Sequence, residues 1–168
     1  MSDTVPVTKD ANVHVSIRQL TRDEAKSVVK DRRPESGWAI DFPAEGDVTG
    51  AKYAQFVPTS KHEPWFAPWF VIADGLIVGM LGFKGEPLAN VLEVGYSIVP
   101  SAQGRGVATR ALSELLGLVR GRGFTVIAEA ATWNAPSQAI LRRLNFIETG
   151  RRYDVDDGDV VVWRLPAE

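Results

Sequence analysis

The chain has 168 residues, of which 45% are hydrophobic and 24% are charged, and its net charge is −2. These values are typical of an ordinary globular domain and give no reason to expect a nucleic-acid partner. The absence of cysteine excludes disulfides, thiolate nucleophiles and zinc–thiolate sites, and no apolar run approaches the ~20 residues that span a bilayer.

The first half of the chain predicts a strand and a helix, then a second short helix, then three consecutive strands. The helix signal is a capping box, Thr21 with Glu24, and the hairpin signal is Asp74-Gly75 between two apolar runs. Residues 1–12 are expected to be a flexible tail without the order of a signal peptide, so a cytoplasmic protein is the default expectation. The expected elements are a strand over 14–20, a helix over 21–31, a loop over 33–47, a helix over 48–57 and strands over 69–73, 76–85 and 90–99.

In the second half of the chain, helices and strands alternate. The first helix begins near Arg105 and ends at Gly123, and its apolar stripe consists of Ala108, Ala111, Leu112, Leu115 and Val119. The elements that follow are a strand over 124–132, a helix over 135–144 and a closing hairpin over 146–155 and 159–165. We therefore expect one mixed α/β (α+β) domain over residues 1–168, in which an antiparallel meander leads into a strand–helix–strand–helix section. The last strand could pair across a homodimer.

Two spaced glycines stand where the strand over 90–99 leads into the next helix, in "QGRGVA", residues 103–108. Such a junction presents unpaired backbone N–H groups at a helix N-terminus, where the helix dipole is positive. Gly104 and Gly106 leave these donors open to a bulky anion, and Arg105 adds a charge-assisted contact. Residues 101–152 also carry eight arginines against three glutamates. The pattern is neither a P-loop nor G-x-G-x-x-G, since GK[ST] is absent and Thr109 takes the third glycine position. A phosphate-bearing ligand is indicated, with a plain turn as the alternative.

The same segment, read as Q-x-x-G-x-A from Gln103 to Ala108 after a strand that carries Glu93, resembles the coenzyme-A-binding motif of the GNAT N-acetyltransferases. A second segment has residues at the offsets of that family: Asn134, Ser137, Leu144 and Phe146. Its N-x-x-S form is most similar to the RimJ/RimL-like branch. The resemblance implies a GNAT fold, in which a mixed, mostly antiparallel central sheet of about seven strands is flanked by helices and splayed at the acetyl-CoA site.

The resemblance also implies where acetyl-CoA, the co-substrate, binds, and it implies no metal. The pyrophosphate is expected on the amides of Gln103, Gly104, Arg105, Gly106, Val107, Ala108 and Thr109. The pantetheine arm is expected along Ile98 and Val99, at backbone groups exposed where adjacent strands splay, with Asn134 and Ser137 facing it.

Two side chains are candidates for the chemistry of acetyl transfer to an amine. Glu93 stands where several GNAT enzymes place a general base, and the alternative is a surface glutamate on an alternating strand. Leu141 stands where many family members place a tyrosine that protonates the leaving thiolate. In the RimJ/RimL-like branch the serine of N-x-x-S has been given that task, and here Ser137 could instead position the sulfur or cap a helix. An acceptor pocket that favours a cationic amine is expected from Trp38, Asp41 and Trp133.

The sequence therefore predicts an acetyl-CoA-dependent N-acetyltransferase in which a primary amine attacks directly in a ternary complex. The acceptor stays open between a protein N-terminal α-amine, as the branch suggests, and a small amine. Two other classes are a non-catalytic acyl-CoA-binding domain and a phosphate-binding α/β domain outside the family. The presence of Glu93 and Ser137 argues against the first class, and the N-x-x-S segment argues against the second. No nucleic-acid or membrane partner is expected, and a homodimer stays open.

Overall fold

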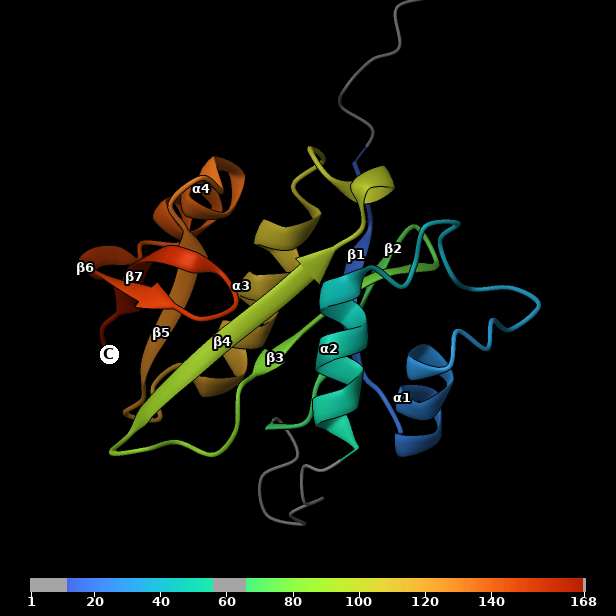
Figure 1. The fold of residues 1–168 in the computed structure, drawn as a ribbon, viewed down its shortest axis with the longest axis horizontal. Coiled ribbons are helices and arrows are strands. Elements are labelled where there is room, and N and C mark those ends of the chain that lie inside the picture. The colour runs from blue at the N-terminus through green and yellow to red at the C-terminus, as the bar shows by residue number, and fades with distance from the viewer. Residues whose placement is uncertain (1–11, 56–65, 168) are drawn as a thin grey trace, which may run out of the picture.

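Seven strands form one mixed sheet in the computed structural model, which describes residues 12–55 and 66–167 (Figure 1). The strand order is β1-β2-β3-β4-β5-β7-β6, and every neighbouring pair is antiparallel except β4 and β5. The strands are β1 (Val15–Gln19), β2 (Trp69–Ala73), β3 (Leu76–Phe83), β4 (Val91–Ile98), β5 (Thr125–Ala131), β6 (Ile147–Asp154) and β7 (Gly158–Leu165). The predicted mixed, mostly antiparallel sheet of about seven strands is confirmed. Residues 1–11 of the predicted tail lie outside the described residues.

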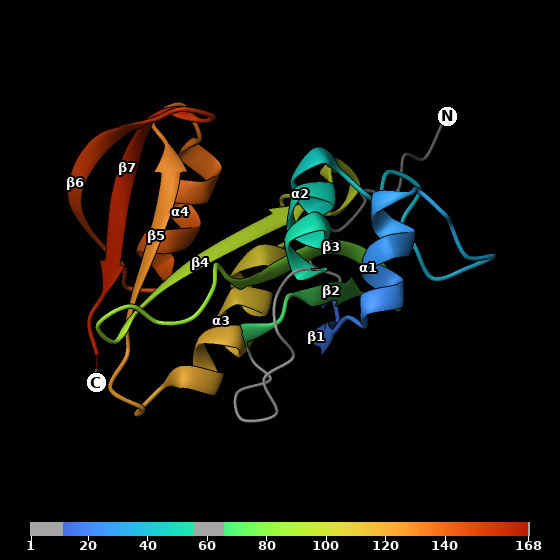
Figure 2. The same ribbon diagram turned by 60° about the horizontal axis from the view of Figure 1, so that its bottom comes forward.

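Four α-helices cover the two faces of this sheet: α1 (Arg22–Val29), α2 (Glu45–Ala54), α3 (Val107–Val119) and α4 (Ala135–Arg143). Helices α1 and α2 pack on one face, and α3 and α4 pack on the other (Figures 1 and 2). Among the described residues, none of the helices has the length and apolar character needed to cross a membrane.

Local signals explain where the first two helices begin. The predicted capping box of α1 is present, since Glu24 N donates to Thr21 Oγ1 at 3.2 Å and Thr21 N donates to the Glu24 carboxylate at 2.8 Å. Helix α2 starts three residues earlier than the sequence predicted, inside the expected loop. There the Asp47 carboxylate accepts from Ala44 N at 2.8 Å, which is one half of a capping box, and the other half is missing because the N-cap residue, Ala44, has no side-chain acceptor.

The hairpin predicted at Asp74-Gly75 joins β2 to β3 and is confirmed. Both turn residues have positive φ, 49° at Asp74 and 83° at Gly75, as a tight two-residue hairpin turn requires. At the other end of the sheet, β7 lies between β5 and β6 and is paired with both. The suggestion that the last strand pairs across a homodimer is therefore wrong, because among the described strands the edges are β1 and β6.

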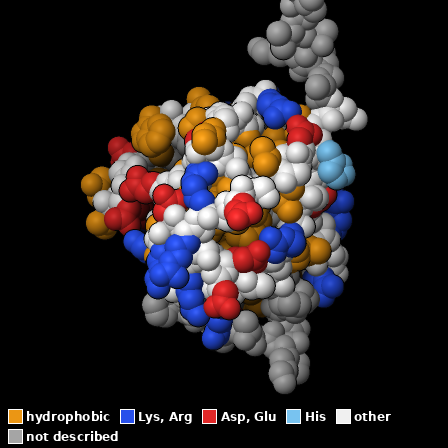
Figure 3. Space-filling view, turned by 90° about the vertical axis from the view of Figure 1, so that its right-hand side faces the viewer, with side chains coloured by type: hydrophobic (Ala, Val, Ile, Leu, Met, Phe, Trp, Pro, Cys, Tyr) orange, Lys and Arg blue, Asp and Glu red, His pale blue; other side chains and the backbone are white. Residues whose placement is uncertain are grey.

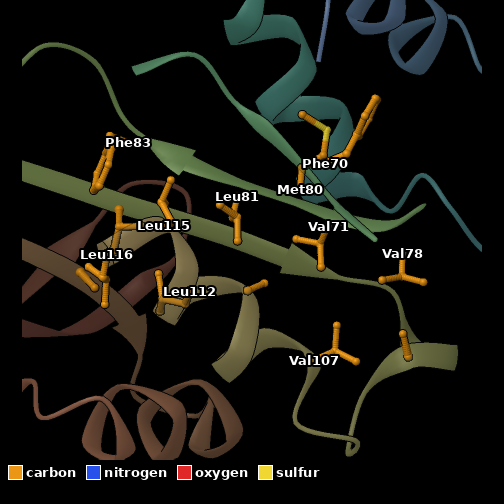
Figure 4. Close-up of a cluster of buried hydrophobic side chains, with 14 of the residues drawn as sticks. Phe70, Val71, Val78, Met80, Leu81, Phe83, Val107, Leu112, Leu115 and Leu116 are labelled. Atoms are coloured by element: carbon orange, nitrogen blue, oxygen red, sulfur yellow. The ribbon is translucent and has the colours of Figure 1, made fainter. Parts of the chain in front are cut away.

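The core lies on both faces of the sheet because successive strand residues point to opposite sides. Phe70 and Met80 lie on the side of α2, whereas Val71 and Leu81 lie on the side of α3 (Figure 4). Helix α3 fills the second side with its predicted stripe, except that Val107 is buried where Ala108 was expected. The list of α3 side chains buried here is Val107, Ala111, Leu112, Leu115, Leu116 and Val119.

Candidate active site

Strands β4 and β5 are parallel neighbours that pair only over part of their length. Their register runs from Val91 opposite Thr125 to Val94 opposite Ala128, and β4 then continues to Ile98 paired with β3 but not with β5. The two strands diverge beyond that point (Figure 2). The predicted splay of adjacent strands is confirmed, and it opens a gap in the middle of the sheet.

The part of β4 beyond Val94, which pairs with β3 but not with β5, presents main-chain groups to this gap. Val99 N donates to Val78 O at 2.9 Å, on the side of β3. Because consecutive strand residues direct their N–H and C=O groups to opposite edges, Ile98 and Tyr96 direct theirs toward the gap. The Ile98 carbonyl accepts from Gln103 Nε2 at 2.8 Å, so the Ile98 N–H and both Tyr96 groups face the gap. Val99 was expected to line the site; its amide is bonded to β3 and its side chain is fully buried, so it does not.

The glycine junction follows a short 3₁₀ turn, Pro100–Ala102, and leads into α3. Gly104 and Gly106 both adopt φ of 73°, a left-handed conformation that favours glycine. Gly106 is the N-cap of α3 and makes no side-chain cap hydrogen bond, so the N–H groups of the first turn have no intrahelical acceptor. A Cβ built at either glycine meets nothing within 4 Å. The junction therefore offers uncapped N–H donors with open space above them.

A cleft of about 740 Å³ joins the strand gap to the glycine junction. Among the described residues, its lining comes from the end of β4, the junction, the start of α3, the loop before α4 and α4 along its length: Tyr96, Ser97, Ile98, Ala102, Gln103, Gly104, Gly106, Val107, Ala108, Thr109, Trp133, Asn134, Pro136, Ser137, Ala139, Ile140 and Arg143. The structure thus brings together every residue predicted to bind the co-substrate except Val99 and Arg105. A cleft of this size is ordinary for a small-molecule site.

Two of the nearby arginines are engaged elsewhere, and one lines the cleft. Arg105 forms an ion pair with Asp74 at 2.8 Å, which ties the junction to the β2–β3 turn. The guanidinium of Arg142 lies 5.0 Å from the centre of the Trp163 ring. Arg143 lines the cleft and is exposed, so it supplies positive charge to an anion bound there.

The start of α4 places Ser137 against β4. Asn134 is the N-cap, and its Oδ1 accepts from Ser137 N at 3.1 Å, so the cap is Asn134 and not Ser137. The Ser137 Oγ lies 2.6 Å from the Tyr96 hydroxyl. Leu141 is fully buried in the core, so a side chain at that position does not reach the cleft. Tyr96 is among the cleft residues that sequence reasoning missed. Because alternate strand residues share a side, its position two residues before Ile98 is the signal that could have found it.

Glu93 lies on the face of β4 opposite to Tyr96, within the part of the strand that still pairs with β5. Its carboxylate is 2.6 Å from Lys84 Nζ, and its side chain is 31% exposed. Three residues of strand rise separate it from Tyr96, about 10 Å. The Glu93 carboxylate is therefore too far from the gap for direct contact with a group bound beside Tyr96.

The three residues predicted for the acceptor pocket are not brought together. Trp133 is exposed in the cleft, which neither Trp38 nor Asp41 lines. Trp38 packs edge-on against Phe42, with ring centres 5.0 Å apart. The hydroxyl and amide of Ser101 donate to Asp41 at 2.6 and 2.8 Å, and these hydrogen bonds lower the pKa of Asp41. The loop that carries Asp41 is thereby fastened beside the end of β4.

On the side of the molecule that bears α1, acidic and basic side chains of the described residues are interspersed (Figure 3). Sequence reasoning missed a buried carboxylate, Asp47, in the first turn of α2. Among the described residues, no group of three His, Asp or Glu side chains is placed to hold a metal ion.

The Asp47 side chain is fully buried between α2 and the sheet. Its Oδ2 accepts from Ala44 N at 2.8 Å, and its Oδ1 has no hydrogen-bond partner among the described residues. Burial raises the pKa of the Asp47 carboxyl to about 6, and the neighbouring charge of Asp41 acts in the same direction. No sequence pattern marks this residue, because its burial depends on how α2 packs on β3 and β4.

Comparisons with known proteins agree with this geometry. A family model described as an acetyltransferase (GNAT) domain matches residues 14–147, and no curated protein matches the chain. RimL, a ribosomal L7/L12 alpha-N-protein acetyltransferase solved with coenzyme A, superposes with a TM-score of 0.68 at 18% identity, over 91% of this chain and 94% of that one. The ribosomal-protein-S5-alanine acetyltransferase of Vibrio fischeri superposes with a TM-score of 0.68 at 17% identity, over 92% of this chain and 94% of that one.

RimJ of Mycobacterium smegmatis, solved with a coenzyme A disulfide, has a TM-score of 0.62 at 20% identity, over 91% of this chain and 82% of that one. At these identities the structural likeness shows the fold, and it includes members of the expected RimJ/RimL-like branch. The family itself is shown by the domain model, which covers most of the described chain. The chain belongs to the GNAT family of acetyltransferases.

Proposed function

We propose that the protein transfers the acetyl group of acetyl-CoA to the primary amine of an acceptor, by direct attack in a ternary complex. The observation that carries this proposal is the continuity of the cleft. Uncapped amides for a diphosphate lie at one end of it, and main-chain groups between separated strands lie at the other. An anionic head with a long, amide-bearing arm suits such a site, and coenzyme A has this form.

In this proposal the residues of the cleft bind and orient. The first-turn amides of α3 hold phosphate, Arg143 adds positive charge in the same cleft, and the gap-facing groups of Tyr96 and Ile98 hold the arm. Acetyl-CoA supplies an activated acyl carbon when it is bound. The Ile98 N–H is placed to polarise a carbonyl oxygen in the gap. Glu93, on the opposite face of β4, accepts the proton of the attacking amine through water.

We propose a protein N-terminal α-amine as the acceptor. The supporting observation is that RimL and the S5-alanine acetyltransferase, whose folds this chain shares, are described as acting on ribosomal proteins. An α-amine, with a pKa of about 7.7–8.0, costs roughly 1.4 kcal/mol to deprotonate at pH 7, whereas a lysine costs nearly 5 kcal/mol. A base that acts through water suits the easier acceptor.

A thiol-release assay tests this function, with acetyl-CoA offered to N-terminal peptides, free amino acids and polyamines. We expect turnover with at least one N-terminal peptide, and loss of turnover when its α-amine is blocked. Turnover with small amines and with none of the peptides would mean that the acceptor is a small amine and not a protein α-amine. Tight acetyl-CoA binding without turnover on any amine would point to a non-catalytic acyl-CoA-binding domain.

Substitution of Gly106 tests the phosphate end of the cleft. In Gly106→Val, a branched side chain occupies the open space over the amides of α3, and we expect acetyl-CoA affinity to fall well over tenfold in a titration calorimetry measurement. Gly123→Val is the matched control, since Gly123 has φ of 77°, also has nothing within 4 Å of a built Cβ, and lies beyond the C-terminal end of α3. Both substitutions carry the same left-handed strain of about 1–2 kcal/mol. Equal acetyl-CoA affinities in the two variants would mean that the phosphate does not bind at this junction.

A further inference from the structure

Tyr96 and Ser137 are 41 residues apart in sequence and meet across the cleft. Their hydroxyl oxygens are 2.6 Å apart, and the Tyr96 hydroxyl is also 3.4 Å from the Ser137 carbonyl oxygen. Tyr96 comes from the part of β4 that no longer pairs with β5, and Ser137 comes from the first turn of α4, so this contact bridges β4 and α4. The reaction steps proposed above use the main-chain groups of Tyr96 but give its hydroxyl no role.

The number of protons on the two hydroxyls limits the hydrogen bonds that this pair can donate. Each hydroxyl has one proton. In the 2.6 Å contact either hydroxyl can be the donor. The Ser137 amide donates to Asn134 Oδ1. In the arrangement in which the Tyr96 hydroxyl donates to Ser137 Oγ, the Ser137 hydroxyl proton is left to donate into the cleft that this residue lines.

We propose that Tyr96 is the positioning residue for Ser137: it holds the serine oxygen from β4, so that the serine proton points at the sulfur of coenzyme A in the gap. This inference rests on the proposed function. In the reaction it serves, the bond between the amine nitrogen and the acyl carbon forms, and the bond between that carbon and sulfur breaks. The sulfur leaves with the electron pair and takes its proton from solvent water, while the amine loses its proton to Glu93 through water. The pair donates a hydrogen bond and keeps both of its own protons.

A hydrogen bond, and not full proton transfer, follows from the acidities. Burial raises the pKa of the Tyr96 phenol above its ordinary value of about 10. A coenzyme A thiol resembles a cysteine thiol, with a pKa of about 8.5. Transfer of the Tyr96 proton to the thiolate is therefore uphill by more than a pKa unit. A donated hydrogen bond, in contrast, stabilises the developing negative charge without leaving a tyrosinate behind.

The first test is a cycle of Tyr96→Phe, Ser137→Ala and the double variant. We expect kcat to fall about threefold to tenfold in each single variant, the range of one hydrogen bond. KM for acetyl-CoA should change less than twofold. The double variant should be no slower than Ser137→Ala, because Tyr96 acts only through Ser137. Tyr153→Phe, at a tyrosine 71% exposed on β6, is the matched control and should leave kcat unchanged.

The second test does not depend on turnover. A hydrogen bond to the thiolate lowers the pKa of bound coenzyme A, so its affinity should rise between pH 7 and pH 9 relative to that of acetyl-CoA, which has no thiol. The charged or titratable side chains that line the cleft in the described part of the chain are Arg143 and Tyr96, and burial raises the pKa of the Tyr96 phenol. Calorimetric titration of the two ligands should show this rise in the unmodified protein and its loss in Tyr96→Phe.

The outcomes separate this inference from the function on which it rests. No binding or turnover of acetyl-CoA in the unmodified protein would remove the proposed function. An active protein in which Tyr96→Phe matches it in kcat and in the pH dependence of coenzyme A binding would overturn the role of Tyr96. So would losses in the two single variants that multiply in the double variant. A Tyr96→Phe protein that only unfolds at a lower temperature would make the contact a structural tie between β4 and α4.

Discussion

Glu93→Gln is expected to lower turnover by about 10²–10⁴-fold, the range for loss of a general base, while acetyl-CoA affinity stays unchanged. The structure places Glu93 on the face of β4 opposite to the cleft, so the substitution leaves the cofactor contacts intact. Glutamine keeps the size of the side chain and removes its capacity to accept a proton. The loss should shrink as the pH rises through the α-amine range, since more of the acceptor is then neutral without help.

Two controls separate a base from a structural ion pair. Lys84→Met breaks the 2.6 Å contact with Glu93 but keeps the carboxylate, and turnover should stay within about threefold of the unmodified enzyme, the size of a weak ion-pair effect. Glu129→Gln removes another strand carboxylate that is ion-paired, to Arg152 at 2.5 Å, and should also leave turnover unchanged. If Lys84→Met is as slow as Glu93→Gln, or if the Glu93→Gln loss is the same at every pH, Glu93 is structural and another group takes the proton.

Local patterns predicted the parts of this site that local chemistry decides. The glycines of the junction are required by their own left-handed backbone, and Asn134 caps the helix that begins beside it. Both features depend on residues within a few positions, so a sequence motif carries them. The hairpin at Asp74-Gly75 is of the same kind.

The parts that sequence reasoning missed depend on long-range pairing. The main-chain groups of Val99 point to β3 and those of Tyr96 point to the gap, because alternate residues of this segment bond to β3. The sequence does not show which residues form these bonds. The contact between Tyr96 and Ser137 exists only because β4 and β5 separate after Val94. The insertion of β7 beside β5 is likewise a property of the sheet and not of the hairpin that contains it.

Asp47 is the remaining residue of this kind, and its replacement by asparagine should stabilise the fold at neutral pH. The folded-state pKa of about 6 lies above the ordinary value of 3.8. Between about pH 4 and pH 6 the folded protein holds a proton that the unfolded chain has released. The carboxyl therefore destabilises the fold increasingly as the pH rises through this range. At 1.36 kcal/mol per pKa unit, the penalty reaches about 3 kcal/mol above pH 6.

Asparagine is neutral at every pH and keeps the acceptor for Ala44 N. Its NH₂ group replaces the Oδ1 that has no partner among the described residues, beside the Ser97 hydroxyl, which can accept. Denaturant unfolding should thus show Asp47→Asn about 3 kcal/mol more stable than the unmodified protein at pH 8, with the difference vanishing near pH 4.

Asp41→Asn is the control of opposite sign, because the hydrogen bonds from Ser101 lower the pKa of Asp41. That carboxylate stabilises the fold above its unfolded pKa, so its removal should cost stability at pH 8 and the cost should disappear in acid. Acetyl-CoA affinity should be unchanged in Asp47→Asn, since Asp47 does not line the cleft. If Asp47→Asn is less stable at pH 8 than the unmodified protein, the ionised carboxylate makes contacts that an amide cannot replace. Its charge would then stabilise the packing of α2 on β4.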